Sequence, residues 1–364
     1  MMKIALLNLP FDNNYGGNLQ RYALMKILQE MGHDVTHIFQ RISFRLPLYR
    51  WPLVLAKRLI KKIIFRDSAP IFREHQRNLF ENKKADIALP FYEKYIKHTA
   101  PVRTISDLNK VTKNKFDGYI VGSDQVWRED MTRQLGIDNY FFAFAKNSKA
   151  KKIAYAVSLG VETNAFPPNK LEDLSLLYSK FNAVSYRELS AKQIFERNGW
   201  DNPKPQLVLD PTLLLETDNY DKIISENETT VQTKGKIYCY VLDQSDRVKS
   251  IINEKRDELH LDVVLKDLNN SSNPATIPQW LCDIKNAEYV ITDSYHGTIF
   301  SILFRKPFLF LGNERRGNTR MDSLFSLLGI DNRTNDFIIC DNSVYEKIRD
   351  LKQESLNFLS RSLS

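Results

Sequence analysis

The sequence predicts an α/β protein of two doubly wound, Rossmann-like domains that face each other across a cleft. Short apolar segments alternate along the chain with segments of helical periodicity, an order typical of parallel sheets covered by helices. The 364 residues exceed the size at which one hydrophobic core stops growing. A polar stretch at 216–235 separates two such alternating halves, so we place the domain boundary there.

The composition is that of an ordinary globular protein, with 43% hydrophobic and 26% charged residues. Its three cysteines, Cys239, Cys282 and Cys340, are widely spaced and form no CxxC pair, so neither a disulfide framework nor a zinc cluster is expected. The first residues lack the cleavage site of a signal peptide and are predicted to form a buried strand. We therefore expect a cytoplasmic protein.

The first domain, expected at 1–215, opens with a strand at 3–8 and a turn rich in Asp, Asn and Gly. Apolar side chains then repeat at helical spacing, namely Leu24, Ile27, Leu28 and Met31. Gly32 stands where a helix commonly ends, and a second strand follows at 35–39. The opening is therefore a strand–helix–strand unit.

A basic insert is expected at about 41–84. Its first part, 41–66, has no acidic residue, and its eight basic residues are interleaved with aromatic and aliphatic ones. The basic residues are Arg41, Arg45, Arg50, Lys57, Arg58, Lys61, Lys62 and Arg66. Their charges exclude a helix that spans the bilayer, but the mixture suits a helix lying on an anionic membrane surface. The alternative stays open that this helix packs its apolar side on its own domain, as amphipathic helices more often do.

The rest of the chain continues the alternation. Further strands are expected at 119–121, 153–157, 183–185, 206–209, 237–242, 262–265, 289–292 and 307–311. Helices are expected at 248–258 and 278–286, so the second domain should cover 234–340. Apolar residues on one helical face predict a closing helix at 341–364 that packs across the interdomain side.

Parallel sheets bind ligands outside the carboxyl ends of their strands, so we expect the active site in the cleft. The residues after the strand at 289–292 are the strongest candidates. Asp293, Ser294, His296, Gly297 and Thr298 stand between that strand and an apolar helix, whose free N–H groups favour an anion such as phosphate. Because imidazole exchanges protons near neutral pH, His296 suits general acid–base catalysis.

Two polar clusters of the first domain are candidates for sugar contacts. Gly17, Asn18 and Gln20 lie in a glycine-rich turn that lacks dinucleotide-binding spacing, and a simple strand-to-helix turn explains its glycines equally well. Ser123, Asp124, Gln125 and Trp127 follow a strand and suit hydroxyl contacts and ring stacking, although Asp124 could simply cap the next helix. We expect Asp124 and Asp293 to join His296 in proton transfer.

Four arginines are placed to hold an anion at strand ends. Arg187 follows the strand at 183–185, while Arg315, Arg316 and Arg320 follow the strand at 307–311. The sequence has no HExxH motif, no clustered acidic and histidine residues and no phosphate-binding P-loop motif. We therefore predict no metal and no cofactor.

Six segments, taken in order, resemble the polysaccharide pyruvyl transferases. These are YGGNLQRYAL, FDGYIVGSDQVW, AYAVSLG, AVSYRE, LVLDPTLLL and AEYVITDSYHGTIFSILFRKPF, and the match runs from about residue 3 to 330. The basic insert and the C-terminal tail carry no motif of that family. The resemblance implies a GT-B-like fold and transfer of pyruvate from phosphoenolpyruvate onto two hydroxyls of one sugar, giving a cyclic ketal and phosphate.

By this resemblance His296 matches the active-site histidine, and Arg187 matches an arginine that holds the donor. Many relatives have Arg-x-His where this chain has Ser294, Tyr295 and His296, so one donor arginine is missing there. We expect Arg315, Arg316 or Arg320 to replace it. The family implies a saccharide acceptor carried by a polyprenyl lipid, with the acceptor on the first domain and the donor on the second.

Two rival functions remain. A GT-B glycosyltransferase that uses a nucleotide sugar would have the same architecture. A non-catalytic protein that binds a membrane surface or nucleic acid would explain the net charge of +8, but that charge concentrates in one insert. We therefore predict no nucleic-acid partner, and a cytoplasmic enzyme whose 41–66 region can dock it peripherally on the inner face of the membrane.

Overall fold

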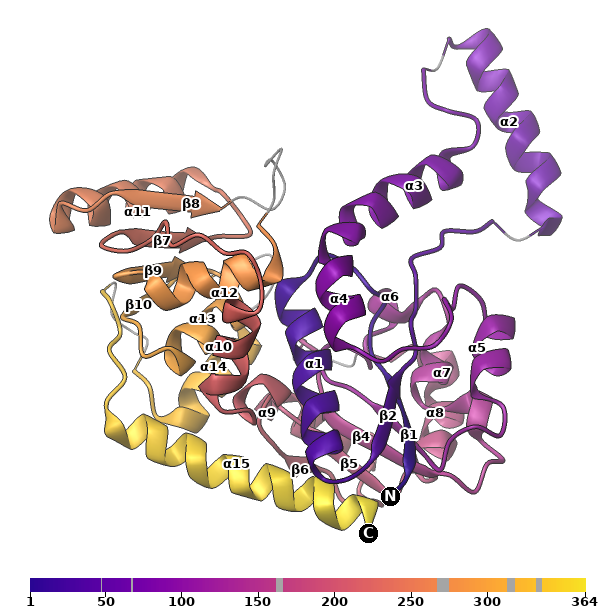
Figure 1. Cartoon of the computed structure of the whole chain (residues 1–364). Helices are drawn as coiled ribbons and strands as arrows, with labels where there is room; N and C mark the ends of the chain where they lie inside the picture. Colours follow the sequence, from indigo (N-terminus) through magenta and orange to yellow (C-terminus); the bar gives the residue numbers. More distant parts are fainter. Residues whose placement is uncertain (47, 67, 162–165, 267–274, 313–317, 332–335) are drawn as a thin grey trace.

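The computed structural model describes the chain except residues 47, 67, 162–165, 267–274, 313–317 and 332–335 (Figure 1). It contains two separate parallel sheets flanked by helices, which confirms the predicted fold class. The first sheet has the order β2-β1-β3-β4-β5-β6 and the second the order β10-β9-β7-β8. In each sheet the strand order reverses once, between β1 and β3 and between β7 and β9.

The first sheet draws all its strands from residues before 208. Its strands are β1 (Lys3–Leu7), β2 (Asp34–His37), β3 (Gly118–Val121), β4 (Lys151–Val157), β5 (Ala183–Tyr186) and β6 (Gln206–Leu207). Its helices are α1 (Tyr15–Glu30), α2 (Trp51–Ile64), α3 (Arg73–Ala85), α4 (Leu89–Tyr95), α5 (Ile105–Thr112), α6 (Glu129–Thr132), α7 (Ile137–Tyr140), α8 (Leu171–Tyr178) and α9 (Leu189–Arg197). The strands are short apolar runs buried on both faces, as in other parallel sheets.

The second sheet is built from the later part of the chain. Its strands are β7 (Ile237–Tyr240), β8 (Val263–Lys266), β9 (Tyr289–Thr292) and β10 (Phe308–Phe310). The helices are α10 (Thr217–Ser225), α11 (Asp246–Leu259), α12 (Ile277–Asn286), α13 (Tyr295–Leu303), α14 (Thr319–Leu328) and α15 (Asn342–Leu363). Part of the polar stretch expected as a boundary is therefore helical, because Tyr220 and Ile223 recur at helical spacing and are buried.

Aromatic side chains join the two halves at the start of α1. The Tyr15 ring lies 5.5 Å from that of Trp280 and 6.0 Å from that of Tyr240, both in the second half. The Tyr15 hydroxyl also donates to the carbonyl oxygen of Ala275 at 2.5 Å. These contacts place the N-terminal end of α1 directly against the second half.

Helix α15 contacts both halves (Figure 1). Ser355 accepts a hydrogen bond from the backbone N–H of Leu209 at 2.9 Å, and the Phe358 ring lies 6.2 Å from that of Tyr155. At the other end of α15, the Tyr345 hydroxyl donates to the Ile302 carbonyl oxygen in α13. The helix thus ties the second half back to the first sheet.

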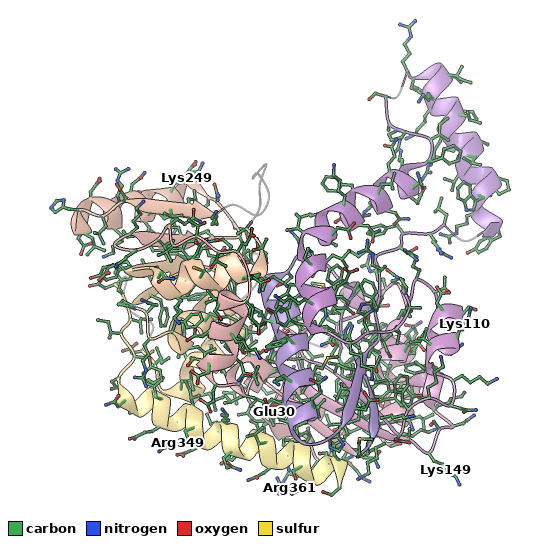
Figure 2. The ribbon with its side chains drawn as sticks, viewed as in Figure 1. Glu30, Lys110, Lys149, Lys249, Arg349 and Arg361 are labelled. Carbon is green, nitrogen blue, oxygen red and sulfur yellow. The ribbon has the colours of Figure 1, made fainter. Side chains whose placement is uncertain are left out.

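The basic insert forms an arm that stands away from the rest of the molecule (Figures 1 and 2). We use the name "arm" for residues 41–84. Its helix α2 has no buried residue, so its apolar side is not packed on the domain that carries it. None of the helices in the described part of the chain combines the length and the apolarity needed to cross a bilayer.

Candidate active site

The site lies where the strand order of both sheets reverses, which is where open parallel sheets bind ligands. Ser123 and Asp124 follow β3, and His296 follows β9 at the start of α13. Residues from the two halves meet here. Arg320 of the second half lies 3.5 Å from the Asp124 carboxylate, and His296 lies 3.8 Å from the carboxylate of Asp210.

His296 is held at the N-terminal end of α13. Ser294 caps this helix by accepting from the backbone N–H of Gly297. Gly16 of α1 lies against the imidazole, because a Cβ built on Gly16 would lie only 2.0 Å from Nδ1. The glycine at this position therefore lets α1 approach the histidine closely.

The imidazole of His296 is chemically available. Its Nε2 atom is buried and has no hydrogen-bond partner among the described residues. Burial lowers the pKa of His296 to about 4, because the opposing attraction of Asp210 does not offset the loss of solvation. The side chain is therefore neutral at pH 7, and this nitrogen can accept a proton.

Arg187 is the centre of the charge network. Its guanidinium donates to Asp210 at 2.5 Å, to Asp124 at 2.8 Å and to the Ser123 hydroxyl at 3.3 Å. Only 1% of its side chain is exposed. Because both terminal nitrogens already bind carboxylates, Arg187 is placed to fix the geometry of the site, and its contact with a donor would need one of these bonds to move.

Asp210 is a site residue for which the sequence suggested no role. Its side chain is fully buried and accepts hydrogen bonds from Gln20 and Arg187, both at 2.5 Å, and from Thr212. Burial alone would raise the pKa of this carboxyl, but the Arg187 charge, together with the hydrogen bonds from Thr212, outweighs burial and lowers it. Asp210 therefore stays ionised and faces His296 and Arg187 together.

Asp124 is the second carboxylate of the network. Its backbone lies in the left-handed region, with φ of 75°, which turns the residue out of the line of β3. Burial alone would raise the pKa of its carboxyl, but Arg187 and Arg320 lower it. Asp124 is thus ionised and lies between the two guanidinium groups.

Tyr295 forms an aromatic platform between the two arginines. The Arg187 guanidinium carbon lies 4.7 Å from its ring centroid and that of Arg320 lies 5.7 Å from it, within the range of cation–π attraction. The Arg320 side chain is 19% exposed and its contact with Asp124 is long for a charge-assisted hydrogen bond. Arg320 is therefore more open to a bound anion than Arg187 is.

Two predicted acceptor residues belong to the interior instead. Trp127 is fully buried, its ring stacks on Phe141 at 4.3 Å, and its indole N–H donates to the Tyr140 carbonyl oxygen. Asn18 is also fully buried and bonds to the backbone of Asp12 and to Arg21. Both side chains are thus engaged in the interior, and their contact with a sugar stays a prediction.

Two predicted residues of the second half also have structural roles. Both carboxylate oxygens of Asp293 accept backbone N–H groups, from Leu242 and from Asp243, so it shapes the loop after β7. Thr298 is fully buried and its hydroxyl donates to the Ser294 carbonyl oxygen. The catalytic role of Asp293 and the donor contact of Thr298 stay predictions beside these structural roles.

The remaining predicted residues fall into three groups. Gln20 and Ser123 are nearly buried and bond to the Asp210 and Arg187 network, as described above. Gly17 is half-buried in the first turn of α1, while Gln125 is nearly buried and lies against Gly160. Arg315 and Arg316 lie outside the described residues.

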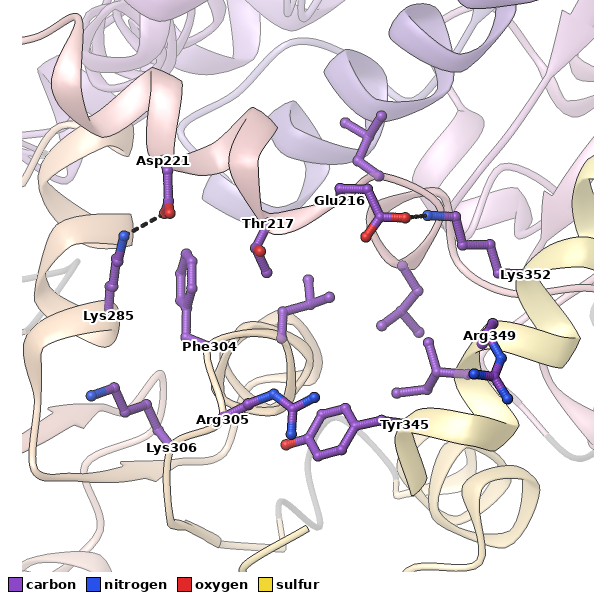
Figure 3. A pocket seen from close by; sticks show the side chains of 14 residues that line it. Glu216, Thr217, Asp221, Lys285, Phe304, Arg305, Lys306, Tyr345, Arg349 and Lys352 are labelled. Atoms are coloured by element: carbon purple, nitrogen blue, oxygen red, sulfur yellow. Dashed lines mark hydrogen bonds and ion pairs between the residues drawn. The ribbon is translucent and has the colours of Figure 1, made fainter. Parts of the chain in front are cut away.

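A hollow lies apart from these residues. It has a volume of about 620 Å³ and is lined from α10, α12, α13 and α15 (Figure 3). Its two carboxylates are paired with lysines, Asp221 with Lys285 and Glu216 with Lys352 (Figure 3). Among the described residues, no group of three or more histidine, cysteine or acidic side chains is placed to hold a metal ion.

The two parallel sheets, with charged residues gathered where their strand orders reverse, define a GT-B-like fold. The S. aureus MnaA–UDP structure shares this fold, with a TM-score of 0.53 at 12% identity over 99% of this chain and 91% of that one. Anabaena Alr3699/HepE in complex with UDP and glucose gives 0.48 at 9% identity, over 99% and 100% of the two chains. Methanocaldococcus jannaschii UDP-GlcNAc 2-epimerase gives 0.44 at 13% identity, over 97% and 100%.

The family follows from the sequence match. A family model described as polysaccharide pyruvyl transferase matches residues 14–315, which include every described site residue named above except Arg320 and Asp12. The chain therefore belongs to the polysaccharide pyruvyl transferase family and is a transferase, which confirms the resemblance seen in its motifs. No curated protein matches the sequence.

Proposed function

We propose that the protein transfers pyruvate from phosphoenolpyruvate onto two hydroxyls of one sugar of a bacterial surface polysaccharide or of its lipid-linked precursor. The observation that carries this proposal is the buried, neutral and unpartnered Nε2 of His296, set beside two guanidinium groups. Family membership supplies the reaction class. The charge network supplies the groups that such a reaction needs.

The reaction needs one proton at C3 of the enol phosphate and loses one from each attacking hydroxyl. Protonation makes C2 electrophilic, the first hydroxyl adds there, phosphate leaves, and the second hydroxyl closes the ketal ring. His296 is the proton-transfer group in this proposal: its neutral form takes the hydroxyl proton. An anionic donor beside the imidazole would also favour the protonated form that C3 requires.

Arg320 is our candidate for the arginine missing from the segment at 294–296. It comes from α14 of the second half, reaches the Tyr295 ring and contacts Asp124 at 3.5 Å. A phosphate or carboxylate of the donor can bind its guanidinium in a fork-like pair. Arg187 holds the donor side in the same proposal, with Ser294 and Gly297 at the helix start and with Arg315 and Arg316 as further candidates.

The acceptor sugar is assigned to the first half. Gly17 and Gln125 are our candidates for its hydroxyl contacts. Gln20 and Ser123 are positioning residues in this proposal, because they hydrogen-bond to each other and to Asp210 and Arg187. No cofactor is part of the proposed reaction. The acceptor is a saccharide, which we propose is carried on a polyprenyl lipid.

Donor binding and product mass test the proposal together. Phosphoenolpyruvate should bind saturably in a calorimetric titration. A lipid-linked saccharide supplied with it should gain the mass of one pyruvic acid less one water, which is the increment of a pyruvyl ketal, while free phosphate appears. The Arg320→Gln variant should weaken donor binding, whereas Arg361→Gln, at an exposed arginine of α15, should not. Saturable binding of a nucleotide sugar without binding of phosphoenolpyruvate would instead establish the glycosyltransferase alternative.

A further inference from the structure

The arm presents an apolar surface to solvent. On α2, Leu53 and Ile63 are each 76% exposed, Ile60 is 51% exposed and Ile64 is 67% exposed. At 100° per residue these four side chains fall within about 100° of one another around the helix axis, so they form one face of the helix. Burying such side chains stabilises a structure, so a contiguous exposed face of this kind calls for a partner.

The opposite face of α2 is the one that packs on the rest of the arm. The Trp51 ring lies 6.2 Å from that of Phe72. Arg58 forms a forked ion pair with Glu74, at 2.6 and 2.8 Å, and donates to the Ile71 carbonyl oxygen. The helix is thus held by the segment that leads into α3, and this attachment turns its aliphatic face outward.

Basic side chains lie along one edge of the apolar face and beyond its end. At 100° per residue, Lys57 and Lys61 fall along one edge of that face, whereas Lys62 falls on the opposite side of the helix. Arg66 follows the C-terminal end of α2. All four are exposed, and residues 41–66 include no acid. The pattern is that of helices that lie in a membrane interface, with lysines reaching the headgroups while aliphatic side chains enter the acyl boundary.

The charge of the whole chain concentrates in this arm. Residues 41–84 contain twelve lysines and arginines and three acids, a net charge of +9, whereas the chain as a whole carries +8. The remaining 320 residues are therefore close to neutral, at −1. A surface of negative charge is the partner that complements such an arm.

We infer that α2 docks the protein on an anionic lipid membrane, with its axis in the plane of the interface. A nucleic acid would match the lysines but leave the aliphatic face exposed to water. A second copy of the arm would match the aliphatic face but bring two strongly positive segments together. Anionic lipid complements both features of the helix.

Docking in this way orients the active site. The arm rises from the end of the molecule where α1 begins, and α15 lies at the opposite end (Figure 1). The start of α1 contacts the site, because Gly16 lies against His296. A docked protein therefore turns this end toward the lipid, as a lipid-linked acceptor would require. The docking itself rests on the arm alone and does not depend on the proposed reaction.

Vesicle flotation with the full-length protein tests the inference. The wild type should float with vesicles of phosphatidylcholine mixed with phosphatidylglycerol but not with phosphatidylcholine alone, and added salt should weaken its binding. Changing Lys57, Lys61, Lys62 and Arg66 to Gln should weaken binding by about a hundredfold or more. A second variant, with Leu53, Ile60, Ile63 and Ile64 changed to Ser, should also fail to float.

A matched control removes four exposed charges elsewhere on the surface. Lys110, Lys113, Lys146 and Lys149 are exposed on the body of the first half, where Figure 2 labels two of them. Their change to Gln should leave flotation within about twofold of the wild type. Retained far-ultraviolet dichroism and unchanged unfolding temperature would show that each variant is folded.

Four outcomes would overturn the inference. The first is a wild type that does not float with anionic vesicles, and the second is equal binding by the wild type and both arm variants. A control variant that loses binding as strongly as the arm variants would show a diffuse charge effect. The fourth is a wild type that self-associates in sedimentation but does not float, with the self-association lost in the serine variant. That result would assign the apolar face to a second copy of the chain.

Discussion

The active site and the arm both contain basic residues, but those of the site are buried and paired, whereas those along α2 of the arm are mostly exposed. In the site, Arg187 is buried against two carboxylates, and every strong charge there has a partner of opposite sign. In the arm, exposed basic residues lie on the same short helix as exposed aliphatic ones or just beyond its end, with no acid between 41 and 66. Paired and buried charges fix internal geometry, whereas unpaired and exposed charges of one sign indicate a partner outside the chain.

The largest effect is expected at His296. Changing His296 to Asn removes the proton-transfer nitrogen, so turnover should fall by roughly 10²- to 10⁴-fold. The variant His260→Asn is the control, because His260 is exposed and its left-handed backbone is one that Asn tolerates. Phosphate release in a steady-state assay measures both. Equal turnover of the two variants would remove His296 from the chemistry.

The sequence placed His296 and Arg187 correctly at strand ends, because a strand followed by polar residues can be read locally. It assigned no role to Asp210, since that carboxylate acquires its importance from Arg187 and His296, which are remote in sequence. The packing of Trp127 could not be predicted for the same reason. Its position after a polar segment suggested a sugar platform, but the ring that stacks on it, Phe141, reaches it only through the tertiary fold.

The interior of the arm shows the same limit. Its lysines and aliphatic residues could be counted from the sequence, and both a domain-packed and a membrane-surface helix fitted that count. Only the structure shows that Arg58 and Trp51 face the arm's own segment while Ile60 and Ile63 face solvent. The face of an amphipathic helix that is covered depends on its tertiary neighbours, and the spacing of apolar residues in the sequence does not identify those neighbours.

The next largest effect is expected at Asp210. Asp210→Ala would leave Arg187 buried with one carboxylate fewer, so the free energy of unfolding should fall by about 3–5 kcal/mol. Asp350→Ala is the control, because it removes an acid from an exposed pair with Arg349. It should change the free energy of unfolding by less than about 0.5 kcal/mol. Chemical denaturation measures both values. Similar losses in the two variants would mean that the buried pair contributes no more than a surface one.

Acidification should weaken the folded state through His296. The pKa of this side chain is about 4 in the folded protein against 6.5 ordinarily, so the unfolded chain binds a proton more readily between these values. The stability that this lowered pKa contributes to the folded protein is fully present above pH 6.5. It is lost as the pH falls toward 4, by about 3 kcal/mol.

The His296→Asn variant isolates this contribution. Burial also lowers the pKa of His37, so both proteins should lose stability over the same pH range. The wild type should lose more unfolding free energy than the variant as the pH falls. The difference between the slopes of the two curves of unfolding free energy against pH measures the effect of His296. Parallel curves of unfolding free energy against pH would contradict a lowered pKa at this residue.

A smaller effect is expected where α1 approaches the histidine. A methyl group at position 16 would lie 2.0 Å from the His296 ring, so Gly16→Ala should cost about 1–3 kcal/mol and shift the imidazole. Gly17→Ala is the matched control in the same helical turn, since the nearest atom to its added Cβ lies 3.5 Å away. That change should be neutral or should stabilise the helix by up to about 1 kcal/mol. Thermal unfolding compares them directly.

The smallest effect on the isolated protein is expected in the arm. Changing Lys57, Lys61, Lys62 and Arg66 to Gln removes exposed side chains, so the unfolding free energy should change by less than about 0.5 kcal/mol. Turnover on a water-soluble saccharide should also stay unchanged, while turnover on an acceptor embedded in anionic vesicles should fall. If turnover on both acceptors fell together, the arm would act on the active site itself. The contrast between paired charges that hold the site and unpaired charges that bind a membrane would then be wrong.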